Sequence, residues 1–405
     1  MRVPPDIAIP PGEPLTRITG TMNSENLPGL YLHIPFCRGK CAYCGFYSRT
    51  DLSLIPDFLK SLRAEMTLYR EAFSRIDTVY LGGGTPSILG ASHLEVILDA
   101  VRRQFVIADD AEITVELNPG DLTARALRTL RALGVNRLTL GCQSFDDAVL
   151  AFLGRRHSAG QCRDAILAVR AAGFDDLGLD LIYGLPAPGG DPGTAFRGWL
   201  ASLQTALSFQ PEHLSCYQLT LEADTPLAAT LALSPLSLPD DDLSARYFLT
   251  TSERLEAAGY RHYEVSNFAC DDDHRARHNR KYWDHTPYLG LGPSAHSFDG
   301  TRRWWNPRDF DAWVGALRDG MRPIAGEEIL TLDQLRLEAL FLGLRTREGI
   351  DMEAYRKRYG FDLCAERGDK IAQLAAAGLV RADGYRFSPT RRGLVCADFL
   401  ARFLS

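Results

Sequence analysis

Short apolar segments alternate with amphipathic stretches along residues 30–265. The short segments are rich in Val, Ile, Leu, Tyr and Thr, which is typical of β-strands, and the longer stretches carry apolar residues at helical period. The predicted strands are Leu30–Ile34, Thr78–Leu81, Glu112–Leu117, Arg137–Leu140, Asp176–Ile182 and Leu214–Leu219. The predicted helices are Ile55–Phe73, His93–Phe105, Thr123–Leu133, Ala159–Ala172, Ala195–Leu207 and Asp241–Ala258. This alternation predicts a parallel sheet with helices outside it, either a partly open barrel or a doubly wound sheet.

Glycines and polar residues follow successive predicted strands. After the first five strands come, in order, a loop with three cysteines, Gly82–Pro86, Asn118–Gly120, Gln143 and Gly184–Pro186. Core packing alone would not gather such residues at one end of every strand. Because parallel sheets bind ligands at the carboxyl ends of their strands, this edge is predicted to hold the functional site.

The remaining regions follow other patterns. Residues 1–27 are broken by prolines and are predicted to be a disordered lead before the strand–helix domain, residues 28–265. Residues 266–325 form a connecting region rich in His, Trp, Tyr, Asn and Gly. In residues 326–405, short helices precede a turn at Asp383-Gly384 between two short strands, and a last helix follows. The fold class predicted is α/β, a partial (β/α)6 barrel with a C-terminal helical domain that is winged-helix-like.

Composition and charge narrow the function. Of the 405 residues, 45% are hydrophobic and 24% are charged, as in soluble globular proteins. The net charge of −6 argues against nucleic acid as the main partner, because phosphate binding needs a basic face. No stretch reaches the roughly 18–20 apolar residues of a transmembrane helix, and the N-terminus has no apolar signal segment. We therefore expect a cytoplasmic protein, with Met22 as an alternative start to Met1.

The nine cysteines do not indicate disulfides, because their number is odd and no export signal is present. Three of them form the pattern Cys37-x3-Cys41-x2-Cys44, and most of the other six are predicted to be small buried hydrophobes. Three thiolates can hold three irons of a 4Fe–4S cluster and leave the fourth iron open to a small molecule. Taken alone, the loop leaves two alternatives open: a zinc site with His33 as the fourth ligand, and a chance group of structural cysteines.

Further motifs accompany the cysteine loop in a fixed order. They are Tyr31-x-His33-Ile-Pro, Gly82-Gly-Gly-Thr-Pro-Ser87, Glu116-x-Asn-Pro-Gly120, Gly141-x-Gln143-Ser-Phe145, Gly154-Arg155-x-His157-Ser158, Asp180-Leu-Ile-Tyr-Gly-Leu-Pro186, Glu264-Val-Ser-Asn-Phe268, His278-Asn279-x-x-Tyr282-Trp283 and Gly290-x-Gly-Pro-Ser-Ala-His296. From about residue 29 to the C-terminus, the chain resembles the radical S-adenosylmethionine (SAM) family that contains the oxygen-independent coproporphyrinogen III oxidases and the HemW-type haem chaperones. The resemblance implies a radical SAM partial barrel that uses a 4Fe–4S cluster and SAM.

The resemblance also implies roles for individual residues. Cys37, Cys41 and Cys44 would ligate the cluster, and Tyr31 would lie against the cluster and SAM. The residues expected to contact SAM are Gly83, Gly84, Thr85, Glu116, Gln143, Arg155 and Asp180. Arg155 would face the SAM carboxylate, and Asp180 would accept from the ribose hydroxyls. The alternative for the charged residues is a structural ion pair or cap at a strand end.

Two features separate two members of this family. The decarboxylase has a fourth cysteine two residues after the third, where this chain has Phe46, and it has a longer segment before its cysteine loop. Both departures favour a chaperone that binds haem and delivers it to acceptor haemoproteins, without coproporphyrinogen oxidase activity, so no catalytic residue is assigned. The alternatives are a radical enzyme acting on a porphyrin and one acting on an unrelated substrate. The porphyrin enzyme would be either the decarboxylase or a haem-opening methyltransferase, whose relatives also have three cysteines.

A haem site needs apolar walls and an axial ligand. His278, in the HemW-type motif, is the first candidate for a haem contact, and His285 and His296 are others. Candidate walls are Tyr282, Trp283, Tyr288, Trp304 and Trp305, and Arg302 and Arg303 are candidates to meet propionates. The same aromatic residues would also serve as a core between domains. Besides acceptor haemoproteins, the expected partners are a reductant such as flavodoxin and a peripheral membrane surface.

Overall fold

The computed structural model describes residues 27–186, 191–233, 236 and 238–405. The predicted lead, residues 1–27, therefore lies almost wholly outside the described residues. The strands are β1 Gly29–Ile34, β2 Arg75–Gly83, β3 Val106–Leu117, β4 Arg137–Gln143, β5 Leu177–Tyr183, β6 His213–Gln218, β7 Arg261–His262, β8 Asn267–Ala269, β9 Tyr288–Leu291, β10 His296–Phe298, β11 Arg302–Trp305, β12 Gly326–Ile329, β13 Ile350–Asp351, β14 Val380–Ala382 and β15 Arg386–Pro389. The helices are α1 Ile55–Tyr69, α2 Gly90–Gln104, α3 Ala124–Ala132, α4 Asp147–Phe152, α5 Ala159–Ala171, α6 Pro192–Ser208, α7 Pro226–Ala232, α8 Asp241–Ala257, α9 Arg277–Trp283, α10 Phe310–Arg318, α11 Leu332–Gly343, α12 Met352–Tyr359, α13 Leu363–Ala376, α14 Arg391–Val395 and α15 Ala397–Leu404.

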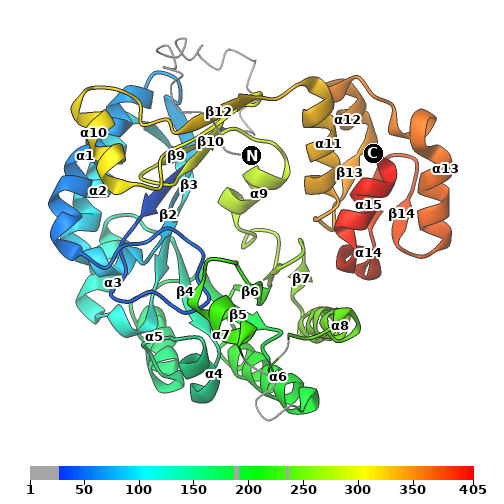
Figure 1. The fold of residues 1–405 in the computed structure, drawn as a ribbon, viewed down its shortest axis with the longest axis horizontal. Helices are drawn as coiled ribbons and strands as arrows, with labels where there is room; N and C mark the ends of the chain where they lie inside the picture. Colours follow the sequence, from blue (N-terminus) through cyan, green and yellow to red (C-terminus); the bar gives the residue numbers. More distant parts are fainter. Residues whose placement is uncertain (1–26, 187–190, 234–235, 237) are drawn as a thin grey trace.

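A curved sheet of twelve strands forms the main body, in the order β12-β11-β10-β9-β1-β2-β3-β4-β5-β6-β8-β7. Strands β1 to β6 pair in parallel and in sequence order. Figure 1 shows α1, α2, α3, α5 and α6 along the outer side of this sheet. The fold is therefore a partial (β/α)6 barrel, which confirms the predicted fold class.

The sequence pattern of the central strands explains their place in the core. In β1, Leu30, Leu32 and Ile34 are fully buried against the outer helices, and the intervening Tyr31 and His33 point to the opposite face. Because both faces of a parallel sheet are covered, the sequences of its strands are almost continuously apolar. The six predicted strands and the six helices that follow them are all present, with bounds that differ by up to six residues, the largest difference being the start of β3 at Val106 instead of Glu112.

The strands between residues 266 and 329 extend the same sheet. Strand β9 pairs in parallel with β1, on the side opposite to β2, and β10, β11 and β12 continue outward as antiparallel strands. These strands have only three or four residues each, which leaves too few positions for a period-two pattern. Gly290 in β9 is required by packing, because a side chain there would meet the His296 backbone of β10.

The C-terminal region builds a separate core. Helices α11 to α15 surround the small antiparallel sheet β13-β15-β14, in which β14 and β15 form the predicted hairpin. Phe298 of β10 belongs to this second core, which joins the main sheet to the C-terminal helices. Helix α9 contacts both β2 and α11 and lies between the two bodies (Figure 1).

A buried carboxylate ties α1 to the returning strands. Glu65 accepts hydrogen bonds from the backbone N–H of Gly292 (2.8 Å), the Asn306 amide (2.5 Å) and the Trp313 indole (3.1 Å). Burial raises the pKa of Glu65 to about 7, while the three donors oppose that rise. This one side chain thus joins α1 to three positions that lie 227 to 248 residues further along the chain.

We expect Glu65→Gln to lower the free energy of unfolding by about 1–3 kcal/mol, because the amide group would turn an N–H toward at least one of these donors. Denaturant unfolding at pH 8, followed by circular dichroism, measures the change. Glu71→Gln, at an exposed glutamate just beyond α1, is the matched control. Equal unfolding midpoints for the two variants would show that the Glu65 carboxylate does not stabilise the fold.

Candidate functional site

A cavity of about 370 Å³ lies at the carboxyl ends of β2 to β6. Its lining includes the predicted residues Cys44, Gly83, Gly84, Thr85, Glu116, Gln143, Arg155 and Asp180. Two further predicted residues adjoin it: Cys37 Sγ lies 3.4 Å from Thr85 Oγ1, and Cys41 Sγ lies 3.5 Å from Arg155 Nη1. The structure therefore brings together residues from the cysteine loop and from five strand ends.

The cysteine loop is held by its backbone. The Cys37 N–H donates to the Arg49 carbonyl (2.9 Å), and the Ala42 N–H donates to the carbonyl of Leu153 (3.2 Å). Cys37, Cys41 and Cys44 are free thiols of intermediate exposure, and burial raises the pKa of the Cys44 thiol. Three free, partly exposed thiols on one anchored loop form a donor set that fits a 4Fe–4S cluster.

The glycine loop after β2 packs directly on the segment that leads to Cys37. The N–H groups of Gly84 and Thr85 donate to the carbonyls of Ile34 and Phe36, each at 2.8 Å. A Cβ on Gly84 would lie 2.6 Å from the Phe36 carbonyl oxygen. Gly83 has φ +107°, a conformation that favours glycine, and a Cβ there would lie 2.6 Å from the His33 ring. This close approach explains why glycines occupy positions 83 and 84.

Two half-buried carboxyl groups and one guanidinium define the charge of the cavity. Glu116 accepts from the Tyr80 hydroxyl (2.8 Å) and from the Gly83 N–H (3.2 Å), and burial raises its pKa. Burial also raises the pKa of Asp180 to about 7, assisted by the nearby charge of Glu116. Arg155 donates to the Gly141 carbonyl (2.5 Å), and its buried Nε has no hydrogen-bond partner among the described residues.

This arrangement complements SAM chemically. The amino and sulfonium groups of SAM are cationic and suit Glu116 and Asp180, and its carboxylate suits the unpartnered donor of Arg155. Gln143 has φ +67° at the end of β4, an uncommon conformation for a residue with a side chain and one that is enriched at ligand sites. The cavity residues therefore fit the cofactor that the sequence predicts.

Tyr31 and His33 lie on the inner face of β1, beside the cavity. The Tyr31 hydroxyl is 3.1 Å from His33 Nδ1, and His33 Nε2 is 2.8 Å from the Tyr47 carbonyl. Burial raises the pKa of Tyr31 well above its usual value, and the charge of Glu116 adds to the effect. Since both ring nitrogens of His33 have partners, the geometry disfavours His33 as the fourth ligand of a zinc site.

Sequence reasoning missed part of the lining. Tyr43, Tyr217, Gln218 and Thr220 also border the cavity. Tyr217 and Gln218 end β6 but fall inside the predicted strand Leu214–Leu219, so the rule used for the first five strand ends, applied to the sixth, would have found only Thr220. Tyr43 lies between Cys41 and Cys44 in the sequence, and burial raises its pKa.

The structure places the candidate haem residues in three different surroundings. His278 is 1% exposed, with Nδ1 2.8 Å from Thr78 Oγ1 and Nε2 2.9 Å from the Tyr282 hydroxyl, so both of its ring nitrogens have partners. His296 is exposed and stacks on Trp305, whereas Trp304 is buried in the main core. Four other candidates share a second cavity of about 470 Å³ beside α11, namely Tyr282, His285, Tyr288 and Arg303.

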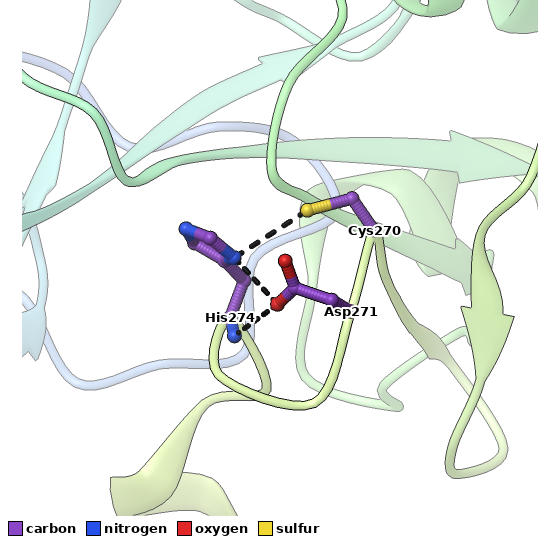
Figure 2. Close-up of side chains that lie close together, drawn as sticks. All are labelled: Cys270, Asp271 and His274. Atoms are coloured by element: carbon purple, nitrogen blue, oxygen red, sulfur yellow. Dashed lines mark hydrogen bonds and ion pairs between the residues drawn. The ribbon is translucent and has the colours of Figure 1, made fainter.

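A further cluster lies on the loop after β8, where Figure 2 shows Cys270, Asp271 and His274 in contact. His274 Nδ1 lies 2.7 Å from Asp271 Oδ1 and 3.4 Å from Cys270 Sγ. Asp271 also accepts from the backbone N–H groups of Asp273 and His274. These hydrogen bonds account for the cluster as part of a turn.

Known proteins match both parts of the chain. Residues 31–189 match the Radical SAM superfamily, and residues 330–396 match the HemN C-terminal domain. The protein named Heme chaperone HemW of Mycobacterium tuberculosis (strain H37Rv) is 38% identical over 409 residues, which cover 99% of this chain and 97% of that protein. The protein of the same name from Synechocystis is 37% identical over 330 residues, which cover 79% of this chain and 78% of that protein.

Among solved structures, coproporphyrinogen III oxidase (HemN) from Escherichia coli superposes with a TM-score of 0.80, covering 94% of this chain and 90% of that chain. Its sequence identity is 24%, so this likeness concerns the fold. The match to the M. tuberculosis relative extends over nearly the whole of both chains. The chain therefore belongs to the radical SAM family whose curated members carry the name Heme chaperone HemW.

Proposed function

We propose that this protein is a haem chaperone, which binds haem and delivers it to acceptor haemoproteins. The observation that carries the proposal is the 38% identity to a protein named Heme chaperone HemW along almost the full length of both chains. The cavity supports it, because the position two residues after Cys44 is Phe46, a cavity-lining side chain that is 65% exposed. That position thus offers no fourth thiol of the kind expected in the decarboxylase.

Cys37, Cys41 and Cys44 would hold a 4Fe–4S cluster, and the cavity beside them would hold SAM. A cluster of this type with SAM bound supplies an electron for reductive cleavage of the sulfonium bond. The protein's own part is to orient SAM: Gly83, Gly84 and Thr85 present backbone groups to its methionine end, and Arg155 pairs with its carboxylate. Asp180 accepts from the ribose hydroxyls, and Glu116 holds the glycine loop in place through the Gly83 N–H.

The proposed setting is the cytoplasm, with a reductant such as flavodoxin as electron donor and a membrane surface as a peripheral contact. No helix in the described part of the chain combines the length and apolar character needed to cross a bilayer. The alternative function is a radical enzyme that acts on a porphyrin. The observation that supports this alternative is the fold shared with the E. coli coproporphyrinogen III oxidase.

We expect Cys37→Ala, Cys41→Ala and Cys44→Ala each to abolish cluster assembly, because a cluster bound through only two thiolates is not retained. Iron and sulfide analysis and the visible absorption band after anaerobic reconstitution measure the loss. Cys364→Ala, at an exposed cysteine of the C-terminal helices, is the control and should assemble a full cluster. An intact cluster in any of the three variants would remove that cysteine from the ligand set.

Asp180→Asn should weaken SAM binding about tenfold while leaving the cluster intact, because a charged acceptor for the ribose hydroxyls is lost. The pKa of Asp180 is raised to about 7, so ionisation is incomplete at pH 6 and largely complete at pH 8. SAM affinity of the unmodified protein should therefore rise between pH 6 and pH 8, and the rise should shrink in Asp180→Asn. Equilibrium dialysis of labelled SAM tests both statements, and equal affinities would reject this role for Asp180.

Anaerobic incubation of the cluster-loaded protein with SAM, dithionite and coproporphyrinogen III separates the two functions. We expect mass spectrometry to show an unchanged porphyrin, and a haem titration of the same preparation to show binding. Loss of two carboxyl groups from the porphyrin would identify a decarboxylase despite Phe46 and would contradict the chaperone proposal.

A further inference from the structure

The second cavity lies where the outer strands of the main sheet face α11, and its volume of about 470 Å³ is within the range of ligand pockets. Most of its wall is apolar or aromatic, and it is contributed by both bodies of the protein. The apolar and aromatic side chains are Tyr282, Tyr288, Phe298, Leu337, Phe341 and Leu342. Leu337 is exposed, so a planar apolar ligand could reach this space from the solvent.

Three polar side chains complete the wall and contact one another. Arg303 Nη1 and Nη2 donate to the two carboxylate oxygens of Glu338, at 2.9 and 2.8 Å. His285 Nε2 lies 3.3 Å from Glu338 Oε2, but without hydrogen-bond geometry, so this buried nitrogen has no hydrogen bond among the described residues. The Glu338 carboxylate therefore contacts both the Arg303 guanidinium and His285 Nε2.

His285 is held in position from its other sides. Its Nδ1 is 3.0 Å from the Tyr359 hydroxyl, and its carbonyl accepts from Arg358 (2.9 Å). Its φ of +57° is unusual for a residue with a side chain, and such strain occurs at ligand sites. Burial lowers the pKa of His285 to about 4, so the imidazole is neutral at physiological pH, which is the form that ligates metals.

We propose, on the basis of the chaperone function above, that this cavity is the haem site, that His285 Nε2 is the axial ligand and that Arg303 pairs with a propionate. In the structure, the Glu338 carboxylate takes the place of that propionate on Arg303 and stands beside the axial nitrogen. Haem entry therefore displaces Glu338, and Glu338 returns as haem leaves.

This exchange suits a carrier. Haem entry replaces one bidentate Arg–carboxylate pair with another, so part of the binding free energy is spent on displacing Glu338. An internal competitor lowers the net affinity and so eases transfer to an acceptor. Arg303 remains anchored throughout, because it also pairs with Glu328 of β12 at 3.1 Å. Glu328 does not line the cavity, and it therefore provides a matched control.

The test is a titration of ferric haem into the full-length, cluster-loaded protein, followed by transfer to apomyoglobin. We expect Glu338→Gln to bind haem about tenfold more tightly and to release it correspondingly more slowly, because the charged competitor is lost. Glu328→Gln, which removes the other carboxylate from the same arginine, should match the unmodified protein. Equal affinities for Glu338→Gln and Glu328→Gln would overturn the competition by Glu338.

The axial ligand has its own test. His285→Asn should weaken haem binding more than tenfold and change the absorption spectrum of the haem, and asparagine tolerates the left-handed backbone at this position. A normal spectrum in His285→Asn would overturn the assignment of His285. If the unmodified protein binds no haem, the chaperone function fails; if it binds haem but every variant behaves like it, this site fails and the function stands.

Discussion

The position of β1 between β2 and β9 is the constraint on which the rest of the structure depends. Both neighbours run parallel to β1, so the cysteine loop, the glycine loop after β2 and the turn after β9 all emerge at the same edge of the sheet. The backbone carbonyls of Ile34 and Phe36 then bind the N–H groups of the glycine loop. This contact places Thr85 against Cys37 and so brings the glycine loop beside the cysteine loop at the cavity.

Desolvation sets the electrostatics of that cavity. Glu116 of β3 and Asp180 of β5 line the same cavity, and burial raises the pKa of both carboxyl groups. Placing two acidic groups in a partly desolvated site costs stability unless a cation compensates, and Arg155 supplies only part of that compensation. A cationic ligand restores the balance, which explains why such a costly arrangement fits a SAM-binding protein.

The second cavity follows a different principle, because it exists only where two cores meet. Phe298 leaves the main sheet and enters the C-terminal core, and α11 then lies opposite β9, β10 and β11. The two buried histidines that flank Tyr282 in the sequence, His278 and His285, therefore have different surroundings. His278 is satisfied by Thr78 and Tyr282, whereas His285 keeps a nitrogen without a hydrogen bond among the described residues.

The sequence alone determined the parts of this protein that depend on neighbouring residues. The apolar periods predicted the six strand–helix units, and the family resemblance carried by the cysteine loop and the strand-end motifs implied a set of cofactor residues, most of which line one cavity. Only the tertiary structure decided that β9 returns beside β1, that His278 is enclosed, and that Glu338 meets Arg303 and His285. The physical reason is that periodicity reports the burial of each element, whereas pairing between distant short strands and helices depends on hydrogen bonds and packing that no local pattern encodes.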